Sequence, residues 1–306
     1  MRSEIIVSGR RIYHLGLAKG ELASNVFLVG DPARADRVAK RFDKINCTVR
    51  NREYVTITGF FRGMPVSVIG TGIGTDNVEI ALIEAFAVNE IDFETQEREA
   101  AGPMTVIRIG TSGGVQPDTQ PGVMAIAKYA LGLDSTGFYN EERPADDTVL
   151  EIEQEAHRIL DASIPRGFRF KGKIFPYASK ASNEVVSALE NQARSEGAEF
   201  QTGITVSSPG FYAASSRFVE GFTNTIPDIK HQLAGLNVKG LKVINMEMES
   251  SLLFHMCRSI GYRAGTICPI ISNPDSSDEI VDYEAIIEKA ITIGLNAMFE
   301  LNGGNR

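Results

Sequence analysis

The sequence has few cysteines and lacks the long apolar runs that are typical of membrane proteins and signal peptides. Its three cysteines (Cys47, Cys257 and Cys268) are an odd number, and none has the spacing of a metal or redox motif. We therefore expect reduced thiols packed as small hydrophobic side chains, as in a cytoplasmic protein. No window approaches the ~18 consecutive apolar residues of a membrane span. Charged residues near the N-terminus exclude the apolar core of a signal peptide.

Positive charge is also scarce. The net charge of −8 excludes a general attraction to nucleic acid or anionic lipid, so a bound anion must be held by a local cluster of arginines. Two common phosphate-binding motifs are missing, because no G-x-x-x-x-G-K-[ST] occurs and Gly70–Gly74 lacks the G-x-G-x-x-G spacing. We expect the glycines of that segment to allow close packing or contact with a small ligand.

The 306 residues instead show apolar, β-branched runs alternating with helical periods along the whole chain. The predicted strands are Val26–Val29, Val66–Ile69, Thr105–Ile109, Val123–Ala127, Ile204–Val206, Val243–Asn245 and Thr266–Ile271. The predicted helices are Ala33–Phe42, Asp76–Asn89, Thr148–Leu160, Ser182–Arg194, Met248–Ile260 and Tyr283–Phe299. This order predicts one α/β domain over residues 1–306, with three layers and a central mixed sheet. Residues 90–104 are expected to form an exposed insertion, and residues 213–240 a mobile flap.

The most informative segment is Asn245–Ser250, which ends an apolar strand and opens an apolar helix. It places Glu247 and Glu249 at the carboxyl end of a strand, where ligands bind in open α/β sheets. A carboxylate there suits the hydroxyls of a sugar better than a phosphate. The alternative is that both glutamates only cap and charge the first turn of the helix.

Three arginines are candidates for holding an anion. Arg34 follows Gly30 at a strand–helix turn, where free backbone N–H groups point outward. Arg108 interrupts a buried strand and needs an anionic partner, since a guanidinium does not lose its charge. The segment Thr111–Gly114 after it offers hydroxyls and backbone N–H groups for an oxyanion. The alternatives are a surface Arg34, an Arg108 paired with a structural carboxylate, and an Arg52 in a surface salt bridge.

Taken together, these segments resemble the uridine phosphorylases of the hexameric nucleoside phosphorylase family. Five motifs occur in the family's order and cover most of the chain. They are His14-Leu15-Gly16-Leu17, Gly30-Asp31-Pro32-Ala33-Arg34, Asn51-Arg52-Glu53-Tyr54, Arg108-Ile109-Gly110-Thr111-Ser112-Gly113 and Asn245-Met246-Glu247-Met248-Glu249-Ser250.

The resemblance implies roles for these positions. Inorganic phosphate, the co-substrate, would be held by Gly30, Arg34, Arg108 and Thr111, with Arg52 from a neighbouring subunit. The ribose would be held by Thr111, Met248, Glu249 and the neighbour's His14. The base would be held by Ser112, Gly113, Phe211, Ser215 and Arg217. Arg108, Glu249 and Arg217 would be the catalytic residues. No cofactor or metal is implied, except a monovalent cation such as potassium at Glu53 in some similar enzymes.

Two departures from the family pattern bear on the base. Uridine phosphorylases usually carry a glutamine where this chain has Ser215, and an arginine where it has Pro274. Purine-cleaving relatives place an aspartate as general acid near Ser272-Asn273. Asn273 cannot act as that acid, although Asp275 is close in sequence. We therefore expect a pyrimidine nucleoside, and above all uridine.

The implied activity is the phosphorolysis of uridine to uracil and ribose 1-phosphate, by a cytoplasmic homo-oligomer whose active site is shared across a dimer interface. Three alternatives share the fold: a purine nucleoside phosphorylase, a hydrolytic nucleosidase and a non-catalytic nucleoside-binding protein. Three convergent arginines favour phosphate over water as the nucleophile. The remaining histidines are expected to be structural or solvated: His157, His231 and His255.

Overall fold

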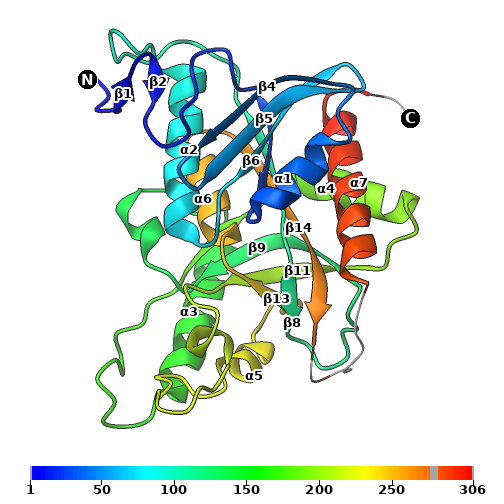
Figure 1. The fold of residues 1–306 in the computed structure, drawn as a ribbon. Coiled ribbons are helices and arrows are strands. Elements are labelled where there is room, and N and C mark those ends of the chain that lie inside the picture. The colour runs from blue at the N-terminus through cyan, green and yellow to red at the C-terminus, as the bar shows by residue number, and fades with distance from the viewer. Residues whose placement is uncertain (1, 274, 276–281, 305–306) are drawn as a thin grey trace.

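The computed structural model describes residues 2–273, 275 and 282–304, and a 12-stranded mixed sheet runs through them. Figure 1 shows this sheet with helices packed around it. The predicted α/β fold with a central mixed sheet is confirmed. The order of the strands is β10-β9-β11-β13-β8-β14-β7-β3-β6-β5-β4, and β12 pairs with β13. The short strands β1 and β2 form a separate pair near the N-terminus.

The strands are β1 (Val7–Ser8), β2 (Arg11–Ile12), β3 (Asn25–Val29), β4 (Lys44–Asn51), β5 (Tyr54–Phe61), β6 (Met64–Gly70), β7 (Thr105–Ile109), β8 (Ser112–Gly114), β9 (Met124–Gly132), β10 (Tyr177–Lys180), β11 (Phe200–Ser207), β12 (Asn237–Val238), β13 (Leu241–Glu247) and β14 (Arg263–Ser272). The helices are α1 (Pro32–Ala39), α2 (Thr75–Glu90), α3 (Asp147–Ser163), α4 (Asn183–Ser195), α5 (Ile229–Ala234), α6 (Ser250–Ser259) and α7 (Tyr283–Leu301). Two short 3₁₀ helices are η1 (Thr136–Tyr139) and η2 (Ala213–Ser215).

Five strands of the sheet form a closed ring. Strand β9 pairs with both β11 and β14, and β13 and β8 complete the circuit between those two. From β14 the sheet continues through β7, β3 and β6 to the outer hairpin of β5 and β4, while β10 pairs with β9 and β12 pairs with β13. Because each strand of the ring has a neighbour on both sides, its backbone is held more firmly than a free edge would be.

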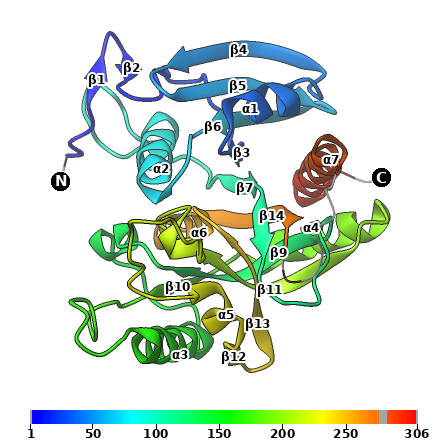
Figure 2. The same ribbon diagram turned by 60° about the horizontal axis from the view of Figure 1, so that its bottom comes forward.

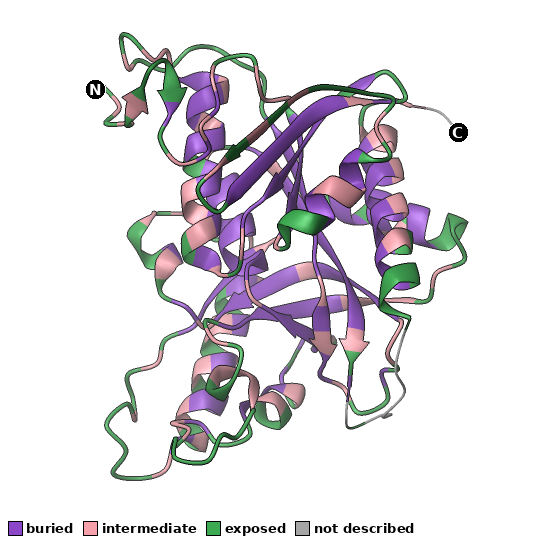
Figure 3. Ribbon diagram, in the orientation of Figure 1, coloured by how far each residue is buried: buried purple, intermediate pink, exposed green. Residues whose placement is uncertain are grey.

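Helices α1, α3 and α7 each begin at an aspartate whose side chain caps the first turn. Asp31 accepts a hydrogen bond from the N–H of Ala33 at the start of α1, and Pro32 occupies the first helical position. Helix α6 packs against α2, β14, β9 and β11, while α4 and α7 pack against each other. Figure 2 shows these helices between and beside the strands, and Figure 3 shows that the strands are mostly buried and the connecting loops mostly exposed.

All seven predicted strands and six predicted helices are found, with ends that shift by a few residues. The hairpin of β4 and β5 was not predicted. Strand β4 is an edge strand whose residues are mostly exposed, so it lacks the apolar run of a central strand. No helix among the described residues has the length and apolar character needed to cross a membrane.

The two segments predicted to be irregular differ from each other. Residues 90–104 connect α2 to β7, and residues 97–103 are exposed. Residues 213–240 are more ordered than the sequence periods suggested, because they contain α5 and β12 and bury Leu233, Leu236 and Val238. That this segment moves as a flap stays a prediction.

Candidate active site

Segments that are far apart in sequence line one cavity of about 1030 Å³. They are the turns after β3 and β6, the β7–β8 connection, the segment after β11, helix α5, the β13–α6 junction and the end of β14. Eleven of the predicted site residues line this cavity: Gly30, Arg34, Arg108, Thr111, Ser112, Gly113, Phe211, Ser215, Arg217, Met248 and Glu249. Three do not: His14, Arg52 and Glu53.

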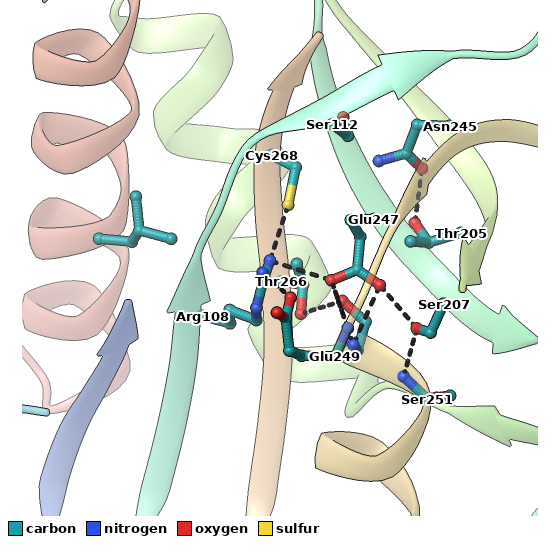
Figure 4. Close-up of polar contacts among 12 residues, drawn as sticks. Arg108, Ser112, Thr205, Ser207, Asn245, Glu247, Glu249, Ser251, Thr266 and Cys268 are labelled. Atoms are coloured by element: carbon teal, nitrogen blue, oxygen red, sulfur yellow. Dashed lines mark hydrogen bonds and ion pairs between the residues drawn. The ribbon is translucent and has the colours of Figure 1, made fainter. Parts of the chain in front are cut away.

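Figure 4 shows the side chain of Arg108 pointing toward Cys268, Glu247 and Glu249. One terminal nitrogen, Nη1, lies 3.0 Å from Oε2 of Glu247 and donates to Sγ of Cys268 at 3.2 Å. The other, Nη2, forms an ion pair with Glu249. Burial lowers the pKa of Arg108, but the carboxylates of Glu249 and Glu247 outweigh that effect and raise it overall. The anionic partner that the sequence requires is therefore a pair of glutamates.

The guanidinium of Arg108 also depends on Gly110, two residues along the chain. A Cβ atom at Gly110 would lie 1.8 Å from Nη1 of Arg108 and 2.7 Å from Sγ of Cys268. Only glycine leaves room for the arginine to reach the two glutamates. This is a packing reason for the Arg-Ile-Gly sequence at the end of β7.

The sequence allowed Glu247 and Glu249 either to cap the helix or to face a ligand, and the structure gives the two residues different contacts. Glu247 accepts hydrogen bonds from the N–H of Ser250 at 3.1 Å, from the N–H of Glu249 at 3.1 Å and from the hydroxyl of Ser207 at 2.6 Å. It therefore caps the first turn of α6, as the structural alternative predicted.

Glu249 is held differently and has fewer protein partners. Its Oε1 accepts a hydrogen bond from the N–H of Gly74 at 2.9 Å, and its Oε2 contacts Arg108. Burial raises the pKa of Glu249, and the neighbouring carboxylate of Glu247 adds to the rise. Gly74 has a φ of 102°, a conformation open to glycine, so the Gly70–Gly74 segment reaches the cavity through its backbone.

Arg34 approaches the cavity from the start of α1. Its side chain is buried, Nη1 donates to the carbonyl oxygen of Ile109 at 3.2 Å, and Nη2 donates to the hydroxyl of Tyr283 at 2.9 Å. Ile109 directly follows Arg108, so both guanidinium groups gather around the end of β7. These two arginines give the cavity wall a positive charge near the end of β7.

His14 and Arg52 lie together on a surface outside this cavity. Asn51 donates hydrogen bonds to the carbonyl oxygens of Tyr13 and His14 at 3.0 and 2.8 Å, and the guanidinium carbon of Arg52 is 4.9 Å from the centre of the Tyr13 ring. Glu84 accepts from Nδ1 of His14 at 2.7 Å and from its backbone N–H at 2.9 Å. The two residues expected from a neighbouring subunit thus share one patch.

Comparisons with known proteins identify the family of the chain. A family model described as "Phosphorylase superfamily" matches residues 25–297. The chain belongs to this superfamily. It is 29% identical to a uridine phosphorylase of Haemophilus influenzae, covering 94% of this chain and 96% of that protein. It is 26% identical to a guanosine phosphorylase of Halorubrum lacusprofundi, covering 94% and 98% of the two chains.

A solved structure of a nucleoside phosphorylase has the same fold as this phosphorylase superfamily member. The chain superimposes on a nucleoside phosphorylase from Trypanosoma brucei, described as showing uridine phosphorylase activity, with a TM-score of 0.85 and 27% identity. The match covers 97% of this chain and 100% of that one. The predicted resemblance to the nucleoside phosphorylase family is confirmed.

Two of the predicted base-binding residues of this phosphorylase, Phe211 and Arg217, contact each other. The guanidinium carbon of Arg217 lies 3.9 Å from the centre of the exposed Phe211 ring, and its Nη1 donates to the carbonyl oxygen of Phe211 at 2.6 Å. The hydroxyl of Ser215 lies 2.9 Å from the carbonyl oxygen of Gly210 and 3.1 Å from the hydroxyl of Ser208. The contacts of Ser215 are thus internal to its own segment.

Sequence reasoning missed a second charged cluster on the cavity wall, made of Asp228, Lys230, His231 and Asp275. His231, which was expected to be structural or solvated, has a half-exposed side chain that lines the cavity with a carboxylate on each ring nitrogen. Hydrogen bonds that His231 donates to the carboxylates of Asp228 and Asp275 raise the pKa of His231. Helix α5 has only six residues, so no sequence period marked these side chains. Within the described ranges, no group of three or more His, Cys, Asp or Glu side chains is placed to hold a metal ion.

Proposed function

We propose that this protein catalyses the phosphorolysis of uridine to uracil and ribose 1-phosphate. The observation that carries the proposal is the buried contact between Arg108 and Glu249, which joins a fixed cation to a carboxylate in one cavity. Phosphate needs the cation, and the ribose hydroxyls need the carboxylate. The 29% identity to a uridine phosphorylase over nearly the full length supports the choice of uridine.

The chemistry requires the protein to position charges rather than to supply a base. An oxygen of phosphate, which is already an anion, forms a bond to C1′ of the ribose as the C1′–N1 bond breaks. The bonding electron pair leaves with the base, whose negative charge spreads onto its carbonyl oxygens until it takes a proton from solvent. The sugar becomes cationic in the transition state, so the adjacent phosphate stabilises it.

Each part of the substrate then has a partner. Arg34 and Arg108, with Thr111 and the backbone of Gly30, would bind phosphate as charge-assisted donors. Glu249 would accept hydrogen bonds from the 2′- and 3′-hydroxyls, beside Met248. Phe211 would stack on the base, with Ser112, Gly113 and Ser215 nearby, and Arg217 would turn from Phe211 toward a carbonyl oxygen of the base. Arg108, Glu249 and Arg217 are the catalytic residues of this proposal.

A direct test measures uridine cleavage with and without phosphate and identifies the products by chromatography. We expect uracil and ribose 1-phosphate in equal amounts, and no cleavage when phosphate is omitted. Release of free ribose without phosphate would identify a nucleosidase instead. Binding of uridine without any cleavage would identify a non-catalytic nucleoside-binding protein. The guanosine phosphorylase relative makes guanosine and inosine the purine substrates to include.

We further propose that the enzyme is a cytoplasmic homo-oligomer whose sites are shared between subunits. The support is that His14 and Arg52 form one patch outside the cavity of their own chain, although the resemblance to the family implies a place in the site for both. A closed dimer would present each patch to the partner's cavity. A monovalent cation at the exposed Glu53 rests on the resemblance alone and stays a prediction.

Mixed oligomers provide the test of sharing. Arg52→Ala and Arg108→Ala are each expected to be nearly inactive when expressed alone. In a mixed dimer, one site receives both substitutions and the other receives neither. Random mixing should therefore restore about one quarter of the wild-type activity. Activity that does not rise on mixing would show that Arg52 acts within its own chain or not at all.

A further inference from the structure

Four charged side chains on the cavity wall have no role in the proposed binding of phosphate or ribose. They are Asp228, Lys230, His231 and Asp275, and they form one chain of contacts. Nζ of Lys230 pairs with Oδ2 of Asp275 and donates to Oδ1 of Asn273 at 3.1 Å. Nε2 of His231 lies 3.0 Å from the same Oδ2 of Asp275. The Lys230 side chain is only 14% exposed, so its charge is fixed in place.

This cluster presents an unused donor beside an unused acceptor. The ammonium of Lys230 has three N–H groups, and the described contacts use two of them. Among the described residues, the two hydrogen-bond donors to Asp275 both meet Oδ2, which leaves Oδ1 as an acceptor. His231 holds Asp275 from one side, and Asp228 holds His231 from the other. Lys230 and Asp275 are therefore held in fixed positions by their neighbours.

The residues expected to bind the base do not supply a hydrogen-bond donor beside an acceptor. The hydroxyl of Ser215 is engaged with Gly210 and Ser208, and Ser215 stands where similar enzymes carry an amide. Arg217 can donate hydrogen bonds but cannot accept them. A base whose ring N–H must be recognised still needs an acceptor in the wall, and Asp275 provides one.

We infer that Lys230 and Asp275 recognise the lactam edge of the base, in which a carbonyl oxygen adjoins a ring N–H. Lys230 would donate to the carbonyl oxygen and Asp275 would accept from the N–H. The inference rests on the proposed function and names the substrate class of the same cavity. Uracil and the 6-oxopurines carry this edge. Cytosine and adenine carry an amino group beside a bare ring nitrogen, so each would set donor against donor and acceptor against acceptor.

The position of Lys230 also bears on the rate. When the C1′–N bond breaks, negative charge develops on the carbonyl oxygen of the leaving base. A fixed ammonium at that oxygen stabilises the charge more in the transition state than in the bound nucleoside. Lys230 should therefore affect kcat as well as KM, and it should do so only for bases that carry the carbonyl group.

The experiment compares kcat/KM for uridine, inosine, cytidine and adenosine in the presence of phosphate. For the wild-type protein we expect a much higher kcat/KM on the lactam nucleosides than on cytidine and adenosine, and the uridine and inosine arms separate a pyrimidine from a purine preference. For Lys230→Met we expect the uridine-to-cytidine ratio of kcat/KM to fall by about 10²–10³. Lys230→Arg should retain part of the ratio. Asp275→Asn, which preserves shape, should also lower it, because an amide can donate to the bare ring nitrogen of cytosine.

Lys239→Met is the matched control, because Lys239 pairs with Glu151 at 2.7 Å outside the cavity. This variant should keep the wild-type ratio. If the cluster only anchors the chain, Lys230→Met and Asp275→Asn will lower all activities equally and leave the ratio unchanged, which overturns the inference. Should Lys230→Met not fold, the isosteric Asp275→Asn gives the same decision. A wild-type protein that cleaves no nucleoside with phosphate would instead refute the proposed function.

Discussion

Arg108→Met lowers kcat/KM for uridine by about 10²–10³ and raises the phosphate concentration needed for half-maximal rate. The reason is that Arg108 is a buried cation of the cavity, and a methionine of similar length supplies no donor to phosphate. Initial rates measured over a range of phosphate concentrations would show both effects. An unchanged phosphate dependence would remove Arg108 from the phosphate site.

Arg37→Met is the control for the loss of an arginine that bridges two carboxylates. Arg37 pairs with Glu284 at 2.7 Å and with Glu288 at 2.9 Å, and it lies outside the cavity. We expect this variant to keep its activity and its phosphate dependence. A comparable loss in both variants would mean that the effect comes from general destabilisation.

Arg108→Met should also reduce stability in a way that depends on pH. Removing one partner of a buried ion pair costs about 3–5 kcal/mol, because Glu247 and Glu249 stay buried without a cation. Burial already raises the pKa of Glu249, and the loss of Arg108, which lowers it, raises it further. The charged carboxylate destabilises the folded state above that pKa, and protonation removes the penalty below it. Urea unfolding should therefore show a smaller deficit near about pH 5 than near about pH 8.

Glu249→Gln gives the second large effect, a loss of about 10²–10³ in kcat/KM for uridine. The neutral amide is a weaker acceptor for the 2′- and 3′-hydroxyls, and it no longer balances Arg108. 2′-Deoxyuridine lacks one of these hydroxyls, so its kcat/KM should fall less. The measurement is the ratio of kcat/KM for uridine to that for deoxyuridine, which we expect to drop toward one.

Glu247→Gln is the matched control because Glu247 also pairs with Arg108 but serves the first turn of α6. It should lower the free energy of unfolding and keep the uridine-to-deoxyuridine ratio. If Glu247→Gln changes that ratio and Glu249→Gln does not, the two glutamates have been assigned the wrong way round.

Much of the fold was predictable because its central strands are long apolar runs with helices between them. The requirement for an anionic partner of Arg108 was also predictable, since a buried guanidinium keeps its charge. That it meets both Glu247 and Glu249 was not predictable, because only the geometry of the β13–α6 junction brings the two carboxylates to Arg108 and makes Glu247 the cap of the helix. The sequence singled out Glu249 only through its resemblance to known enzymes.

The second charged cluster escaped prediction for a different reason. Lys230 and His231 meet Asp275 across more than forty positions of the chain, and neither side of that contact carries a periodic pattern. Strand β4 was missed because it is polar and exposed at the edge of the sheet. Both failures arise where tertiary contacts, rather than local patterns, determine the structure.

The closed ring of β9, β11, β13, β8 and β14 has an evolutionary consequence. Glu247 ends a strand of this ring, whereas Phe211, Arg217 and Lys230 belong to a connection that leaves the ring after β11 and returns at β13. Insertions, deletions and exchanges in that connection leave the pairing of the ring intact. Changes confined to this connection can therefore alter the base preference of related enzymes and leave the rest of the active site unchanged. Exchange of residues 208–236 among relatives in the laboratory would use the same tolerance of the connection to change.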